Sequence, residues 1–141
     1  MSRLIRNSSL ATLSGIALST AVWADDLADS GEFLCTGWSA TTCTTEGECN
    51  VTEAWRLGMP DFVTVDLQVG KLVTPEASDE QRESDFDVER RDEGLILLHG
   101  VQGDRAWSWV IKESSGEGTM TISSQSSSVT VFTVCTTTES L

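Results

Sequence analysis

Residues 35–49 read CTGWSATTCTTEGEC, and Cys135 follows in the closing stretch VTVFTVCT of residues 129–136. These two stretches hold all four cysteines of the 141-residue chain. An even number of cysteines in a short exported chain indicates a disulfide framework. Because three cysteines lie near one end of the chain and the fourth near the other, this framework predicts that the first and last parts of the fold are neighbours in space.

Four cysteines allow three pairings. Cys43–Cys49 closes a short loop around a glycine turn, and it leaves Cys35–Cys135 to join the first strand to the last. The alternatives are Cys35–Cys43 with Cys49–Cys135, and Cys35–Cys49 with Cys43–Cys135. Every pairing ties the two ends of the fold together, and strand geometry favours the first. Neither a redox couple nor a Cys/His zinc site is expected, because there is no Cys-x-x-Cys and only one histidine.

The first 24 residues follow the pattern of a secretory signal peptide. Arg3 and Arg6 give a positive start, residues 10–22 are mostly apolar, and Ala24 precedes the expected cleavage point. The apolar region is too short for a membrane span, so none is expected after cleavage. The predicted organisation is a cleaved signal peptide (1–24), a flexible leader (25–32) and a single β-barrel domain (33–141). We expect the protein in the bacterial periplasm or outside the cell.

The chain is strongly acidic. It has 22 acidic and nine basic residues, a net charge of −13, and loss of Arg3 and Arg6 with the signal peptide makes the charge −15. Nucleic acids and anionic membranes select basic surfaces, so neither is expected as a partner. A negative surface instead favours solubility and attracts basic proteins.

Short segments of alternating polarity, joined by turns that contain glycine, predict an all-β fold. Residues 61–69 and 106–112 alternate apolar and polar side chains, whereas residues 95–99 form the continuous apolar run expected of a buried strand. Residues 50–56 fit either a strand or a short helical turn. Seven or eight such strands predict a small antiparallel meander barrel, or a flattened sandwich, stapled by disulfides.

Trp107 and Trp109 lie on the same side of the strand predicted over 106–112. If that side faces inward, the two rings fill or line the interior of the barrel, where lipocalin-like folds hold one small ligand. If it faces outward, they form an exposed aromatic patch suited to protein or carbohydrate contact. Both tryptophans are therefore candidate ligand-lining residues for a small apolar ligand.

Two further groups of residues are candidate sites. Asp85, Asp87 and Glu89 fall on one face of a strand and form a candidate acidic contact surface. The spacing of an EF-hand is missing, so no metal and no cofactor is expected. His99 is the single histidine, and the nucleophile motif Gly-x-Ser-x-Gly is missing. A hydrolase that uses His99 is therefore the least favoured hypothesis, and no catalytic residue is predicted.

With Cys35 in an early strand, a Trp-x-Trp pair and Cys135 in the last strand, the plan resembles small exported β-barrel proteins of Gram-negative bacteria. That broad class includes periplasmic inhibitors of C-type lysozyme, which bind a basic enzyme. The resemblance implies binding and carries over no site residue. The sequence therefore predicts a non-enzymatic, periplasmic binding or inhibitor-like β-domain that contacts a basic protein through its acidic surface. The alternative is a lipocalin-like barrel with a cavity lined by tryptophan.

Overall fold

The computed structural model describes residues 27–78 and 81–138, with only the backbone at Val88 and Glu89. The described part is built from strands and one 3₁₀ turn, η1 (Ala54–Leu57). The strands are β1 (Glu32–Thr44), β2 (Cys49–Thr52), β3 (Val63–Asp66), β4 (Lys71–Val73), β5 (Glu83–Asp85), β6 (Asp87–Asp92), β7 (Leu95–Gln102), β8 (Arg105–Lys112), β9 (Glu117–Ser123) and β10 (Ser127–Thr137).

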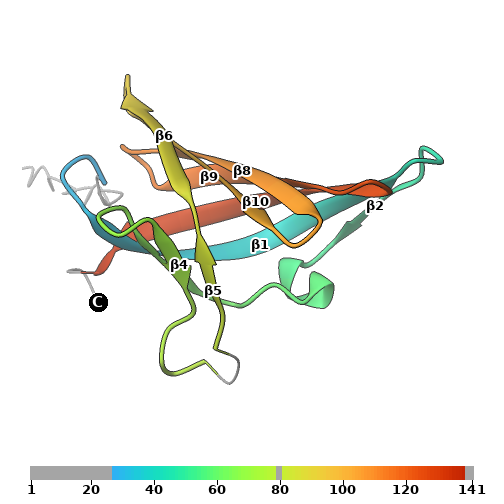
Figure 1. The fold of residues 1–141 in the computed structure, drawn as a ribbon, viewed down its shortest axis with the longest axis horizontal. Helices are drawn as coiled ribbons and strands as arrows, with labels where there is room; N and C mark the ends of the chain where they lie inside the picture. Colours follow the sequence, from blue (N-terminus) through green and yellow to red (C-terminus); the bar gives the residue numbers. More distant parts are fainter. Residues whose placement is uncertain (1–26, 79–80, 139–141) are drawn as a thin grey trace, which may run out of the picture.

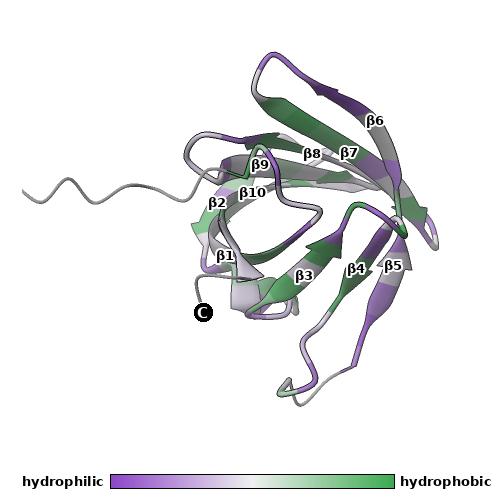
Figure 2. Cartoon of the chain, turned by 90° about the vertical axis from the view of Figure 1, so that its left-hand side faces the viewer, coloured by the Kyte–Doolittle hydropathy of each residue, from purple (hydrophilic) through white to green (hydrophobic). Residues whose placement is uncertain are grey.

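All strands belong to one antiparallel sheet that curls into a half-barrel (Figures 1 and 2). The strand order is β5-β4-β3-β1-β10-β9-β8-β7-β6, and β2 pairs with β1 off this path. Chain neighbours are therefore sheet neighbours almost throughout, and the first long strand pairs with the last. The predicted antiparallel, disulfide-stapled meander is confirmed.

The two edges of the half-barrel are one continuous piece of chain. β5 runs directly into β6 through Phe86, whose N–H leaves the strand pairing and donates to the Gly70 carbonyl at 2.9 Å (Figure 1). The side chain of Gln102 donates to Ser84 Oγ at 2.9 Å, which links β7 to β5 across the seam. The described residues form ten strands rather than the predicted seven or eight. One predicted strand is divided at Phe86 into β5 and β6, and β2 adds a short hairpin.

Two segments differ locally from the sequence prediction. The strand predicted over 61–69 ends at Asp66, because the Asp66 carboxylate accepts the N–H groups of Gln68 and Val69 at 2.8 and 3.2 Å. This side-chain cap turns the chain early and leaves Val69 exposed. Residues 50–56 hold both predicted alternatives, the end of strand β2 and the beginning of η1.

The core lies on the inner face of the curled sheet. Trp107, Trp109 and Ile111 all face inward along β8. For Trp107 and Trp109 the structure thus selects the inward one of the two orientations that the sequence left open. In β7, Ile96 and Leu98 are fully buried, but Leu95 is 43% exposed. The prediction of a fully buried strand over 95–99 is therefore wrong, because the outer face of β7 is open to solvent.

Both disulfides follow the pairing that the sequence favours. Cys35–Cys135 joins directly opposed residues of the β1–β10 ladder, and Cys43–Cys49 joins opposed residues of β1 and β2. Two disulfides fit a secreted or periplasmic protein. The predicted signal peptide lies outside the described residues. None of the helices in the described ranges is long and apolar enough to cross a membrane.

One end of the half-barrel is closed by residues 27–30, which fall in the predicted leader. Leu27 is fully buried in the core, and its N–H donates to the Glu113 carbonyl at 2.9 Å. Arg91 holds this segment from β6. Its guanidinium pairs with the Glu113 carboxylate at 2.6 Å and donates to the carbonyls of Leu27, Ala28 and Ser30.

The loop lengths predict that the two disulfides contribute unequally to stability. Replacing Cys35 and Cys135 with alanine is expected to lower the free energy of unfolding by about 4.7 kcal/mol, because about a hundred residues gain freedom in the unfolded chain. The Cys43→Ala/Cys49→Ala variant frees a far shorter loop and is expected to lose about 2.4 kcal/mol. Urea denaturation of both variants measures the difference, and equal losses would contradict this loop-length argument.

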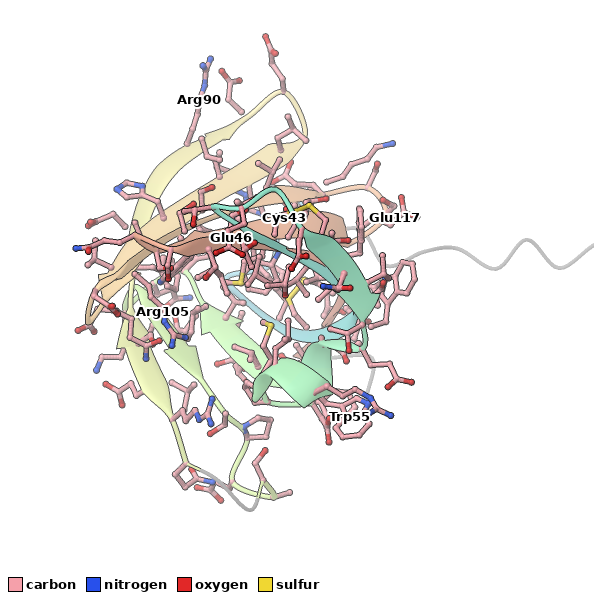
Figure 3. All side chains as sticks on the ribbon, turned by 90° about the vertical axis from the view of Figure 1, so that its right-hand side faces the viewer. Cys43, Glu46, Trp55, Arg90, Arg105 and Glu117 are labelled. Atoms are coloured by element: carbon pink, nitrogen blue, oxygen red, sulfur yellow. A yellow bond between two sulfur atoms is a disulfide. The ribbon has the colours of Figure 1, made fainter. Side chains whose placement is uncertain are left out.

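Arg91→Met is expected to lower the free energy of unfolding by about 2–4 kcal/mol, because it breaks a half-buried ion pair and leaves carbonyls at the closed end without a donor. Arg90→Met is the matched control. Arg90 is the preceding residue, points away from the molecule in Figure 3, and pairs with Asp92 on the surface. The control is expected to lose less than about 1 kcal/mol. Equal losses in the two variants would show that Arg91 does not hold the closed end.

Candidate functional site

The end of the half-barrel opposite residues 27–30 is open and holds a cavity of about 450 Å³. β8 runs from one end of the half-barrel to the other. It begins at the cavity with Arg105 and ends at the closed end. The turns after β7 and β9 and the segment that follows η1 surround the opening. The apolar lining comprises Trp107, Met120, Ile122, Val129, Leu72 and Met59.

Strand alternation places the floor of the cavity. Trp107, Ile122 and Val129 occupy adjacent strands in register, so their side chains form one layer on the inner face. Trp107 is only 7% exposed, and its ring meets Phe86 edge-on at 6.4 Å between centroids. A Cβ at Gly100 would lie 2.6 Å from the indole ring. Glycine at position 100 therefore makes room for the tryptophan that closes the floor.

The two candidate ligand-lining tryptophans have different places. Trp107 lines the cavity, whereas Trp109 lies deeper in the packed core. The indole N–H of Trp109 donates to Thr133 Oγ1 at 2.9 Å, which satisfies both buried polar groups. Trp109 thus packs in the core beneath the floor of the cavity.

Charged side chains stand around the rim. Arg82 Nη1 donates to the Gly58 carbonyl at 2.6 Å, and Glu83 pairs with Lys71. Arg105 differs, because its Nε lies 4.0 Å from the Asp104 carboxylate and its side chain is 66% exposed. The rim therefore presents a guanidinium that is held only loosely.

The wall of the cavity also contains a hydroxyl without a partner. Thr42 lies opposite Val129 on the inner face of β1, and its Oγ1 is buried with no hydrogen-bond partner among the residues that the structure describes. Buried polar atoms of proteins are nearly always satisfied by protein, water or ligand. Because the Thr42 oxygen has almost no accessible surface, a molecule in the cavity reaches it only if neighbouring side chains move.

The segment after η1 forms an apolar lip that sequence reasoning did not single out. Gly58 adopts a left-handed conformation (φ 70°) and ends the 3₁₀ turn, and its N–H donates to the Trp55 carbonyl at 3.0 Å. This turn carries Leu57 and Met59 to the cavity edge. Trp55 itself points outward (Figure 3), and the guanidinium carbon of Arg56 lies over it, 4.8 Å from the centroid of the ring. The short apolar stretch has no periodicity, so the sequence held no signal for its role.

The acidic candidates lie on the outer surface. Asp85 and Asp87 flank the buried Phe86, and each side chain is 87% exposed. Lys71 Nζ lies 3.7 Å from the Asp85 carboxylate and neutralises part of its charge. The side chain of Glu89 lies outside the described part of the chain.

His99 lies in a polar row on the same outer surface. The sheet register sets Asp87 and Ser108 beside it on the neighbouring strands, an arrangement that the sequence did not indicate. Nε2 of His99 lies 3.9 Å from the Asp87 carboxylate, and both side chains are exposed to water. Among the described residues, no cluster of three or more His, Cys, Asp or Glu side chains could hold a metal ion.

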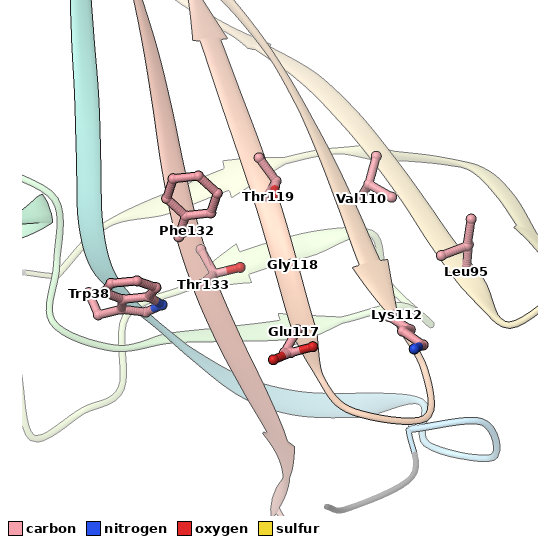
Figure 4. Close-up of a pocket in the computed structure, with 9 residues that line it drawn as sticks. All are labelled: Trp38, Leu95, Val110, Lys112, Glu117, Gly118, Thr119, Phe132 and Thr133. Atoms are coloured by element: carbon pink, nitrogen blue, oxygen red, sulfur yellow. The ribbon is translucent and has the colours of Figure 1, made fainter. Parts of the chain in front are cut away.

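A second hollow, of about 370 Å³, crosses the outer face of the sheet (Figure 4). Trp38 and Phe132 stand side by side at one end, with ring centroids 5.9 Å apart. Leu95 and Val110 lie at the other end. Sequence reasoning missed this groove because the side chains come from five strands whose order only the fold provides.

Comparison with known proteins identified no relative. No protein-family model matches the chain, and no curated protein matches it in sequence. The candidate functions therefore rest on the geometry alone.

Proposed function

We propose that this protein is a non-enzymatic, exported binding protein that holds a small ligand with an apolar body in the open end of its half-barrel. The observation that carries the proposal is the cavity of about 450 Å³ above Trp107. Its volume lies within the range of about 300–1,000 Å³ that is typical of small-molecule sites.

The contrast between the two ends supports this function. Leu27 and the Arg91 contacts close one end, whereas the other end is left open with Ile122, Val129 and Leu72 only half-buried. The protein therefore buries its apolar side chains at the closed end but leaves those at the open end partly exposed to water. Covering them with a ligand recovers about 25 cal/mol for each Å² of apolar surface removed from water.

The row of Asp87, His99 and Ser108 supports catalysis less well than the cavity supports binding. A nucleophile–base pair works best in a concave, water-excluded site with donors aimed at the developing oxyanion. The described side chains of this row instead lie on an open face of the sheet, where the backbone N–H groups serve the strand ladders. Binding without chemistry is therefore the proposed activity.

The proposal predicts that the wild-type protein binds N-phenyl-1-naphthylamine, a neutral apolar dye, with a rise in dye fluorescence. Ile122→Trp is expected to weaken this binding about tenfold, because the larger ring occupies the cavity and crowds its floor. Val101→Trp is the control, since Val101 is well exposed on the outer face of β7. Fluorescence titration measures all three affinities.

Circular dichroism shows whether each variant is folded before titration. A folded Ile122→Trp variant that binds the dye as tightly as the wild type would contradict the cavity as the site. A wild type that binds no dye and no other apolar ligand would contradict the proposed function itself.

A second candidate function is contact with a basic protein through the acidic outer surface. The observation that favours it is the high exposure of Asp85 and Asp87 on a chain of net charge −13. Exposed carboxylates steer a basic partner toward its binding site and raise the association rate.

This second function predicts that the immobilised protein captures basic proteins from an envelope extract at low salt and releases them when salt shortens the Debye length to about 3 Å. Asp85→Asn/Asp87→Asn is expected to reduce capture severalfold. Glu46→Gln/Glu48→Gln changes the net charge equally, in an exposed hairpin turn, and serves as the control. Equal effects of the two variants would indicate a response to net charge alone, and capture of nothing basic would remove this candidate.

A further inference from the structure

We infer that the ligand of the cavity is an amphipathic anion, a long-chain monocarboxylate whose hydrocarbon chain lies over Trp107 and whose carboxylate pairs with Arg105. This inference rests on the proposed function and adds the chemical class of the ligand.

The position of Arg105 follows from strand alternation. Arg105 begins β8 and lies two residues before Trp107, so both side chains belong to the inward-facing row of that strand. Trp107 forms the floor, and Arg105 stands one step nearer to the opening, where its side chain lines the cavity (Figure 3). A ligand with its chain on the indole ring therefore places its outer end beside the guanidinium.

The pairing of the other arginines distinguishes Arg105. Arg56, Arg90 and Arg91 each hold a carboxylate at 2.6 Å. Arg105 approaches Asp104 only to 4.0 Å, the limit of an ion pair, and both side chains are largely exposed. A guanidinium binds a carboxylate best through two parallel hydrogen bonds, and a contact of 4.0 Å leaves that capacity unused.

The other charged groups at the rim leave room for an anion. Glu83 is held by Lys71, and Arg82 adds a second positive charge at the opening, where it donates to the Gly58 carbonyl. Asp104 is the acid that competes most directly, and it lies in the exposed turn before β8. The rim of the cavity is therefore less negative than the surface of the molecule as a whole.

The test compares dodecanoate with dodecan-1-ol, which share the hydrocarbon chain and differ in the charged head group. Both displace N-phenyl-1-naphthylamine in a competition titration, at concentrations below micelle formation. The wild type is expected to bind dodecanoate about tenfold more tightly than the alcohol, as one charge-assisted hydrogen-bonded pair implies. Arg105→Gln is expected to remove this preference, because it weakens the binding of dodecanoate more than the binding of the alcohol.

Arg56→Gln is the matched control, because it makes the same charge change at an exposed side chain that pairs with Glu53. It is expected to keep the preference for dodecanoate. If the wild type binds both compounds equally, or if the two variants behave alike, the inference fails and the proposed function stands. If the wild type binds neither compound and no dye, the proposed function fails as well.

Discussion

The ladder between β1 and β10 is the constraint on which the rest of the structure depends. It pairs residues about a hundred positions apart, from Phe33 opposite Thr137 to Thr44 opposite Ser127. Long-range pairing of this kind carries a loop-closure cost, because bringing the ends of so long a segment together restricts its conformations. The Cys35–Cys135 disulfide joins opposed residues of that ladder and holds the two ends together in the unfolded chain as well, so less conformational entropy is lost on folding. With the first and last strands held together, most other strands pair with a neighbour along the chain, and β3 joins β1 past the short strand β2.

The unequal treatment of the two ends follows from this arrangement. At one end, the Arg91 guanidinium gathers carbonyls of the entering segment and seals Leu27 into the core. At the other end Ile122 and Val129 are only partly buried, and they line the cavity. The seam between β5 and β7, held there by Gln102 and Ser84, completes the wall of the open end. Disulfides cross-link the sheet, and residues 27–30 close one end. The fold can therefore keep its core although the opposite end is open.

The sequence was sufficient for features that depend on local periodicity and on cysteine spacing. It predicted that Trp107 and Trp109 share one side of their strand, both disulfides and the antiparallel meander, and the structure confirms them. Whether that side faces inward was left open by the sequence. It failed at residues 95–99, because an apolar run does not reveal whether its second face is covered. Nor could it locate the cavity, since the side chains that line it come from most of the strands and from the turns at one end. The loosely held Arg105 becomes informative only when that end is seen to be open.

The electrostatic field that acts on an anionic ligand differs between the far surface of this acidic protein and the mouth of the cavity. At physiological ionic strength the Debye length is about 8 Å, so exposed carboxylates on the far surface are largely screened from a ligand at the cavity. The interaction with Arg105, whose side chain is 66% exposed, is partly screened by water, but it acts at contact distance, well within the Debye length. The net charge of −13 therefore slows the approach of an anion without cancelling the local pairing. It follows that net charge, which is the strongest global signal in this sequence, is a poor guide to the charge of the ligand, and that the ligand is selected by the few side chains at the mouth of the cavity.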